Sequence, residues 1–165
     1  MYIFIFHFLF IVILSFTIKN KEVIDKAINE IESNILEIEY SKNISENNWE
    51  MEGEKSYNKI RHNIDKKANI YVILTKCYPE ECDEYEVRYV GKTNDITTRI
   101  KQHTVKCSKG VSSCLEYVKE YILSQNNKKI YISTINVKPV ELNSYIETLL
   151  LNYFDSDNVW YTRTS

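Results

Sequence analysis

Two β-rich segments in the second half of the chain constrain its fold more than any other feature. Residues 70–74 read Ile-Tyr-Val-Ile-Leu, and residues 86–90 read Glu-Val-Arg-Tyr-Val, directly before Gly91. β-Branched and aromatic side chains in such runs are typical of strands. The residues between the two segments are polar and include Pro79, as expected of a loop. We therefore expect an antiparallel hairpin with an enlarged connection.

The residues after the hairpin carry helix and strand patterns in turn. A helix is expected from Asp95, a second after Ser112 or Ser113, a strand over 130–135 and a last helix from Pro139. The chain of 165 residues is long enough for one compact domain with appendages. We expect an α/β (α+β) fold: a small three-stranded antiparallel sheet flanked by helices, in the order β-β-α-α-β-α, over residues 69–165.

Residues 19–68 are expected to form an arm that precedes this domain. Isoleucines at alternating steps of four and three predict an amphipathic helix; they are Ile24, Ile28, Ile31, Ile35 and Ile38. So short a stripe cannot sustain a coiled coil, so the helix would pack on the domain or pair weakly with a partner. Ser41 to Lys67 is polar and Asn-rich without sustained periodicity, and we interpret it as a linker.

The N-terminus, residues 1–18, is almost entirely apolar from Tyr2 to Thr17. As a helix at about 1.5 Å per residue, this run suits the apolar part of a signal peptide and is marginal for spanning a bilayer. We expect a secretory signal or a signal anchor, and hence a secreted or membrane-tethered protein. Lys19 and Lys21 lie only after the run, which would instead hold the domain in the cytosol if the segment were an anchor. A buried element of the domain is the other alternative.

Four cysteines bear on the same question: Cys77, Cys82, Cys107 and Cys114. An even number of cysteines behind a signal sequence is typical of disulfides in an oxidising compartment. The spacings C-x4-C and C-x6-C differ from the tight C-x2-C pairs of zinc sites, which makes a metal site the weaker alternative. Reduced cysteines are the third.

The net charge of −2 conceals an asymmetry along the chain. From Glu22 to Glu54 there are 10 acidic residues and two lysines. From Arg88 to Lys129 there are nine basic residues and three acidic ones, and we call this segment the basic block. A basic surface of this kind attracts polyanions, although a solvated helix face can have the same composition.

Several short motifs follow one another between residues 69 and 158. They are Asn69-Ile70-Tyr71, the run from Arg88 to Thr93, Arg99, His103, Glu147 and Asn158. In this order, and on these expected elements, they resemble the GIY-YIG nuclease domain over residues 69–165. The resemblance implies hydrolysis of phosphodiester bonds with a divalent cation, Mg2+ or Mn2+, and it implies the same three-stranded fold.

The resemblance also implies roles for single residues. Tyr71 and Tyr89 match the two motif tyrosines of the hairpin, Arg99 the arginine of the first helix, and Glu147 the metal ligand of the last helix. His103 resembles a histidine often seen one turn after the arginine. The residues expected to contact nucleic acid, DNA rather than RNA, come from the motif, the basic block and the trailing asparagine: Gly91, Lys92, Lys101 and Asn158.

Elementary chemistry agrees with these roles. Phosphodiester hydrolysis needs an activated water, a hard cation at the phosphate oxygens and fixed positive charge for the transition state. Glu147 offers the oxygen ligand that Mg2+ prefers. Arg99 offers a permanently charged guanidinium that can bind a phosphate through two parallel hydrogen bonds. Tyr71 could act as general base if Lys92, Arg99 or a metal-bound water lowered its pKa, with Tyr89 orienting the nucleophile.

Each residue also has an ordinary structural explanation, and two features depart from the family pattern. Strand tyrosines usually pack, and helical Arg, His and Glu residues are usually exposed. Asn69 stands where the family usually has glycine, and the spacer between Tyr71 and Tyr89 is longer than usual. The alternatives are a catalytically weak relative that binds a polyanion and a disulfide-stapled extracellular interaction protein.

Overall fold

The computed structural model describes residues 19–76, 84–105 and 113–154. The apolar N-terminal run therefore lies outside the described residues, as do Cys77, Cys82, Cys107 and Asn158. Among the residues that are described, no helix is both long enough and apolar enough to cross a membrane.

One antiparallel sheet of four strands forms the centre of the molecule. Its strands are β1 (Leu36–Glu39), β2 (Ile70–Lys76), β3 (Tyr85–Lys92) and β4 (Lys129–Ile135), in the spatial order β1-β4-β2-β3. The hairpin expected from the sequence is confirmed, because β2 and β3 pair antiparallel, with a register shift between Ile73 and Leu74. The mixed α/β class is also confirmed. The expected number of three strands is wrong, and the element order of the whole chain differs from the expected one.

The additional strand comes from the segment that we expected to be an arm. Helical residues 19–33 end before β1, so the isoleucine stripe does not continue as a helix through Ile35 and Ile38. Ile38 instead lies in β1, opposite Ile130 of β4, and its side chain is fully buried. A strand needs only alternate apolar residues, and the helical spacing of the isoleucines masked that pattern.

The expected linker between Ser41 and Lys67 is also folded. It contains a short 3-10 helix, η1 (Glu46–Asn48), and the helix α2 (Trp49–Ile60). Its apolar side chains are few, but they pack in the core, which offsets the ordering of a polar segment. They are Ile44, Trp49, Tyr57, Ile60 and Ile64.

Three more helices follow the hairpin, with a 3-10 turn before the last. They are α3 (Ile96–Thr104), α4 (Ser113–Ser124), η2 (Val140–Leu142) and α5 (Asn143–Tyr153). Asp95 is the N-cap of α3 rather than its first residue, because its carboxylate accepts a hydrogen bond of 3.1 Å from the Thr98 amide. Pro139 opens η2, and α5 begins only at Asn143.

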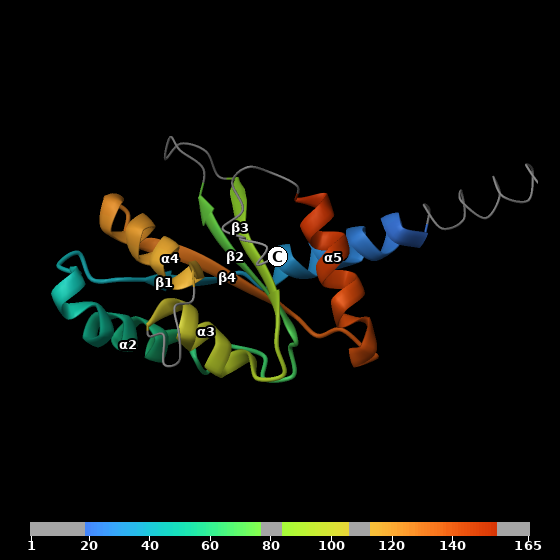
Figure 1. The fold of residues 1–165 in the computed structure, drawn as a ribbon, viewed down its shortest axis with the longest axis horizontal. Helices are drawn as coiled ribbons and strands as arrows, with labels where there is room; N and C mark the ends of the chain where they lie inside the picture. Colours follow the sequence, from blue (N-terminus) through green and yellow to red (C-terminus); the bar gives the residue numbers. More distant parts are fainter. Residues whose placement is uncertain (1–18, 77–83, 106–112, 155–165) are drawn as a thin grey trace, which may run out of the picture.

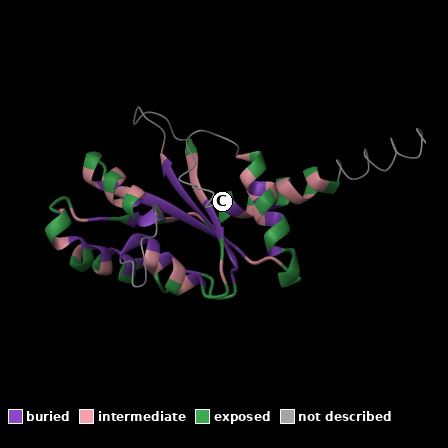
Figure 2. Ribbon diagram, in the orientation of Figure 1, coloured by how far each residue is buried: buried purple, intermediate pink, exposed green. Residues whose placement is uncertain are grey.

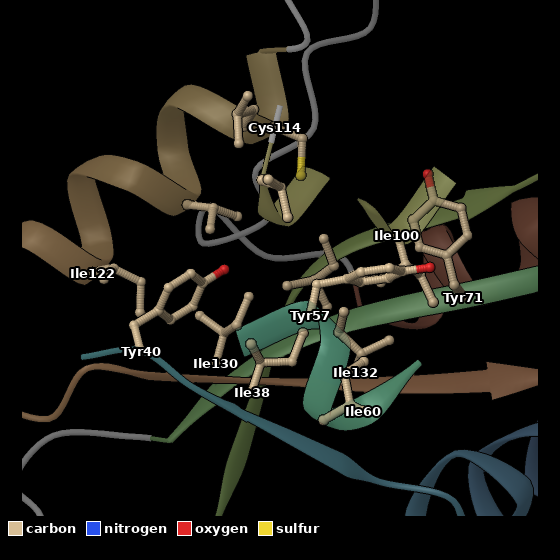
Figure 3. Close-up of a cluster of buried hydrophobic side chains, with 14 of the residues drawn as sticks. Ile38, Tyr40, Tyr57, Ile60, Tyr71, Ile100, Cys114, Ile122, Ile130 and Ile132 are labelled. Atoms are coloured by element: carbon tan, nitrogen blue, oxygen red, sulfur yellow. The ribbon is translucent and has the colours of Figure 1, made fainter. Parts of the chain in front are cut away.

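The helices cover the two faces of the sheet (Figure 1). α2, α3 and α4 pack on one face, where Tyr71 and Ile73 of β2 point. Helical residues 19–33 and α5 pack on the other face, against Ile70 and Val72. The buried residues therefore lie in the sheet and on the inner sides of the helices (Figure 2). Figure 3 shows the first of these cores, with Tyr71 at one end of it.

Candidate functional site

The Tyr71 hydroxyl is held between two side chains of α3. Its oxygen lies 2.8 Å from Nε2 of His103 and accepts a hydrogen bond of 3.3 Å from Nε of Arg99. The tyrosine hydroxyl donates to Nε2 when the histidine carries its proton on Nδ1, and it accepts from Nε2 in the other tautomer. Arg99 and His103 lie one turn apart on α3, so one helix face supplies both partners. We call Tyr71, Tyr89, Arg99 and His103 the tyrosine cluster.

Tyr89 of β3 completes the tyrosine cluster. Its ring stacks on Tyr71 at a centroid distance of 5.8 Å, and lies 5.2 Å from the ring of His103. Such separations are typical of favourable aromatic contacts. Four residues that the sequence spreads over 33 positions thus meet on the sheet face that α3 covers.

Gly91 makes room for this cluster. It lies opposite Tyr71 in the β2–β3 ladder, and a Cβ atom added at Gly91 would be 2.4 Å from the Tyr71 hydroxyl oxygen. The same atom would lie 2.8 Å from a ring carbon of Tyr89. Any larger residue would therefore displace one of the tyrosine rings. The glycine that we expected to contact nucleic acid has at least this internal role.

Burial sets the protonation states of the cluster. Tyr71 has no exposed surface, and this burial, with Tyr89 nearby, raises the pKa of its hydroxyl well above the ordinary value, although Arg99 opposes the shift. Burial and the Arg99 charge lower the pKa of His103 from 6.5 to about 3. Near neutral pH the tyrosine is therefore protonated and the histidine neutral. This arrangement does not supply the lowered tyrosine pKa that a general base would require.

Only part of the cluster reaches solvent. Tyr89 and Arg99 are partly exposed, whereas Tyr71 and His103 are buried. A phosphate group could meet the guanidinium of Arg99 directly, but the Tyr71 hydroxyl lies behind it. The strand tyrosine is consequently more deeply buried than its sequence suggested.

Glu147 and Lys92 form a separate group on the other side of the edge strand. Oε2 of Glu147 lies 3.1 Å from Nζ of Lys92, which also donates a hydrogen bond of 2.7 Å to Oγ of Ser144. Lys92 follows Gly91 directly, and successive strand residues point to opposite faces. α5 packs on the face opposite α3, so the sheet edge separates Glu147 from the tyrosine cluster.

The fit of a divalent cation depends on the oxygens around Glu147. In the described part of the chain, no group of three or more His, Cys, Asp and Glu side chains is placed to hold a metal ion. Mg2+ often takes only one or two carboxylates, with waters and phosphate in the other positions. One further oxygen is notable, because Oδ1 of Asn143 is buried without a hydrogen-bond partner, four residues before Glu147 on α5. Carboxylate and amide oxygens are the types of ligand that a hard cation such as Mg2+ takes.

The charges of the basic block are partly neutralised within the fold. Lys101 pairs with Glu54 of α2 at 2.8 Å, so the helix from the supposed linker supplies a counter-charge to one of the expected contact residues. Further pairs in the described part of the block are Arg88 with Glu86, Lys92 with Glu147, Lys119 with Glu116, and Lys129 with Glu37 and Glu39. These contacts weaken the case for a continuous cationic surface.

Asn69, at the family's glycine position, links β2 to the segment after β4. Its side-chain amide donates to the Val137 carbonyl and accepts from the Val137 amide, both at 2.9 Å. Its backbone also accepts a hydrogen bond from Thr93 at 2.9 Å. An amide with one donor and one acceptor group is suited to this bridge. No pattern in the sequence indicated this role.

Of the four cysteines in the disulfide prediction, only Cys114 lies in the described part of the chain. Cys114, in α4, is a free thiol with 1% exposure, and burial raises its pKa to about 12. A buried thiol of this kind packs as a small apolar residue. The other three cysteines and Asn158 lie outside the described residues, so their pairing and contacts stay predictions.

Comparisons of this chain with protein-family models, with curated proteins and with solved structures found no match.

Proposed function

We propose that this protein is a divalent-metal-dependent endonuclease that hydrolyses phosphodiester bonds of nucleic acid by a GIY-YIG-type mechanism. The observation that carries the proposal is the Tyr71 hydroxyl, held between the Arg99 guanidinium and the His103 imidazole. Three residues adjoin this hydroxyl: the permanently charged Arg99, the partly exposed Tyr89, and Gly91, which has no side chain. The resemblance in sequence supports the same assignment.

The solvent exposure of each residue in the tyrosine cluster determines its proposed role. Arg99 and Tyr89 contact the scissile phosphate, because they are the members of the tyrosine cluster that reach solvent. Tyr71 and His103 position Arg99 in this structure, and Tyr71 reaches a nucleophile only after a local rearrangement. Lys92, Lys101 and Asn158 contact the nucleic-acid backbone, preferably that of DNA.

Glu147 would hold the Mg2+ or Mn2+ ion. When bound, such an ion neutralises charge on phosphate oxygens and activates water. The carboxylate is partly exposed, at 17% of its side-chain surface, so it is accessible from the edge of the sheet. Lys92 is the cationic partner of Glu147 in this structure and must give way to an ion.

A second candidate is a polyanion-binding or extracellular interaction protein without turnover. The complete burial of Tyr71 and the ion pairs of the basic block favour it. Such a protein would have the same fold but would not hydrolyse phosphodiester bonds.

The decisive experiment compares plasmid DNA and RNA incubated with the full-length protein in Mg2+ and in EDTA. The proposal expects cleavage only with metal, and its loss in Glu147→Ala. Glu141→Ala, on the exposed turn before the same helix, is the matched control and should retain cleavage. Binding of nucleic acid without cleavage in all variants would support the second candidate, and cleavage by Glu147→Ala at the parent rate would refute the assigned mechanism.

We also propose that residues 1–18 direct the protein to the secretory pathway or tether it to a membrane, and that cysteines then pair. Mass analysis of the exported protein under non-reducing conditions would test this. Four free thiols would contradict the proposal. Pairing of Cys114 would require its thiol to leave the core.

A further inference from the structure

The ammonium group of Lys92 contacts two side-chain oxygen atoms of α5. It donates to Oγ of Ser144 at 2.7 Å and lies 3.1 Å from Oε2 of Glu147. Both distances are those of direct polar contacts. The ammonium is thus a cation held by one hydroxyl and one carboxylate, tethered to the edge strand β3.

Asn143 adds a third oxygen whose hydrogen bonding is incomplete. Its side chain is only 7% exposed, and its Oδ1 atom is buried without a hydrogen-bond partner. A buried acceptor without a partner destabilises the fold, so an oxygen of this kind calls for an explanation. Asn143 and Glu147 are four residues apart on α5, which sets them on the same helix face.

We propose that Asn143, Ser144 and Glu147 form a site for a hard divalent cation, which Lys92 fills in the metal-free protein and leaves when the ion binds. The inference rests on the proposed function in taking Glu147 as a metal ligand, and it adds two ligands and a competing cation.

The physical reason is the difference between the two cations. Amide, hydroxyl and carboxylate oxygens are the ligands that Mg2+ and Mn2+ prefer. A divalent ion interacts with the carboxylate more strongly than one ammonium charge at a similar distance. Oδ1 of Asn143, which is buried without a hydrogen-bond partner in the metal-free protein, would gain a partner when the ion enters.

Lys92 can leave the site without disturbing the fold. Its side chain is 43% exposed and extends from an edge strand on four flexible carbons. A released ammonium remains next to the ion, where it is available to a phosphate oxygen of the substrate. Lys92 would therefore exchange the Glu147 carboxylate for phosphate, which couples metal binding to substrate binding.

The test measures Mn2+ binding to the full-length protein without nucleic acid, by electron paramagnetic resonance of the free ion. Lys92→Met should raise the affinity about tenfold, the factor expected if Lys92 fills the site about nine-tenths of the time. Lys138→Met, which removes an exposed lysine after β4, is the matched control and should leave affinity unchanged. Glu147→Gln should abolish binding, and Ser144→Ala and Asn143→Ala should each weaken it severalfold.

Asn143→Ala separates a ligand from a structural residue. If Asn143 were merely an unsatisfied core residue, its removal would leave Mn2+ affinity unchanged. Unchanged or weaker affinity in Lys92→Met would overturn the proposal, as would the absence of Mn2+ binding in both the parent and this variant. Because no nucleic acid is present, metal binding with the expected variant pattern but no cleavage would refute the proposed function alone.

Discussion

The hydroxyl oxygen of Tyr71 lies 2.8 Å from Nε2 of His103, across the interface between the second strand of the sheet and the helix that covers it. Neither residue has more than 1% of its surface exposed. Their contact, together with the Arg99 hydrogen bond, makes a polar group at the hydrophobic core. Polar groups in such a setting are costly to leave unpaired.

Tyr71→Phe should destabilise the protein by about 1 to 3 kcal/mol, because Arg99 and His103 lose a common buried partner. Tyr57→Phe is the matched control, since its hydroxyl donates a single hydrogen bond, to the Thr97 carbonyl, from a partly buried site. Urea unfolding at pH 7 measures both. Equal losses in the two variants would argue against a special role for the Tyr71 contacts.

Gly91→Ala should cost about 1 to 3 kcal/mol, since its Cβ would overlap the Tyr71 hydroxyl and the core must shift. It should also reduce any cleavage activity, because the tyrosine moves with it. Gly53→Ala in α2 is the control: its Cβ would lie 3.1 Å from the nearest atom, and alanine favours the helix by about 1 kcal/mol. Thermal melts that rank Gly53→Ala as the more harmful change would contradict this prediction.

The stability of the protein should fall as the pH decreases below 6.5. The fold lowers the pKa of His103 from 6.5 to about 3, so between these values the unfolded chain binds more protons than the folded one. The free energy of unfolding then decreases by up to about 1.4 kcal/mol for each pH unit. Urea unfolding at pH 6.5, 5.5 and 4.5 would measure the slope, with the parent steeper than His103→Gln. Parallel pH profiles would exclude His103 as the cause.

Ile38→Ala should destabilise the protein by about 2 to 5 kcal/mol, the usual cost of a truncated core side chain. Met51→Ala, in α2, should have little effect, because 56% of the Met51 surface is exposed. This comparison tests whether residues 36–60 belong to the folded core. If residues 69–165 alone unfolded with the stability of the whole chain, β1 and α2 would be dispensable.

The parts of the fold that were predicted correctly depend on local patterns. The β2–β3 hairpin follows from two β-rich runs close together in the sequence, and the pairs of residues that share a helix face follow from their spacing. Arg99 and His103 illustrate this, because any α-helix sets residues four apart on one side. The start of α3 was predicted one residue too early, because Asp95 caps the helix and Ile96 is its first residue.

The parts that were missed depend on contacts between distant segments. Leu36 of β1 pairs with Ile132 of β4, and the short strand gains its stability from that partner rather than from its own sequence. α2 is held by a few buried side chains in a mostly polar segment, which no periodicity revealed. Packing against the sheet therefore determined the conformation of both segments, β1 and α2.

The same division holds for the candidate site. The sequence alone determined which residue types are present and that Tyr71, Arg99 and His103 come from neighbouring elements. Only the tertiary structure decided that Tyr71 is fully buried, because exposure depends on which helices cover the strand. It also decided that Glu147 meets Lys92 on the opposite face of the sheet, since the layer in which α5 packs is set by long-range burial of apolar surface.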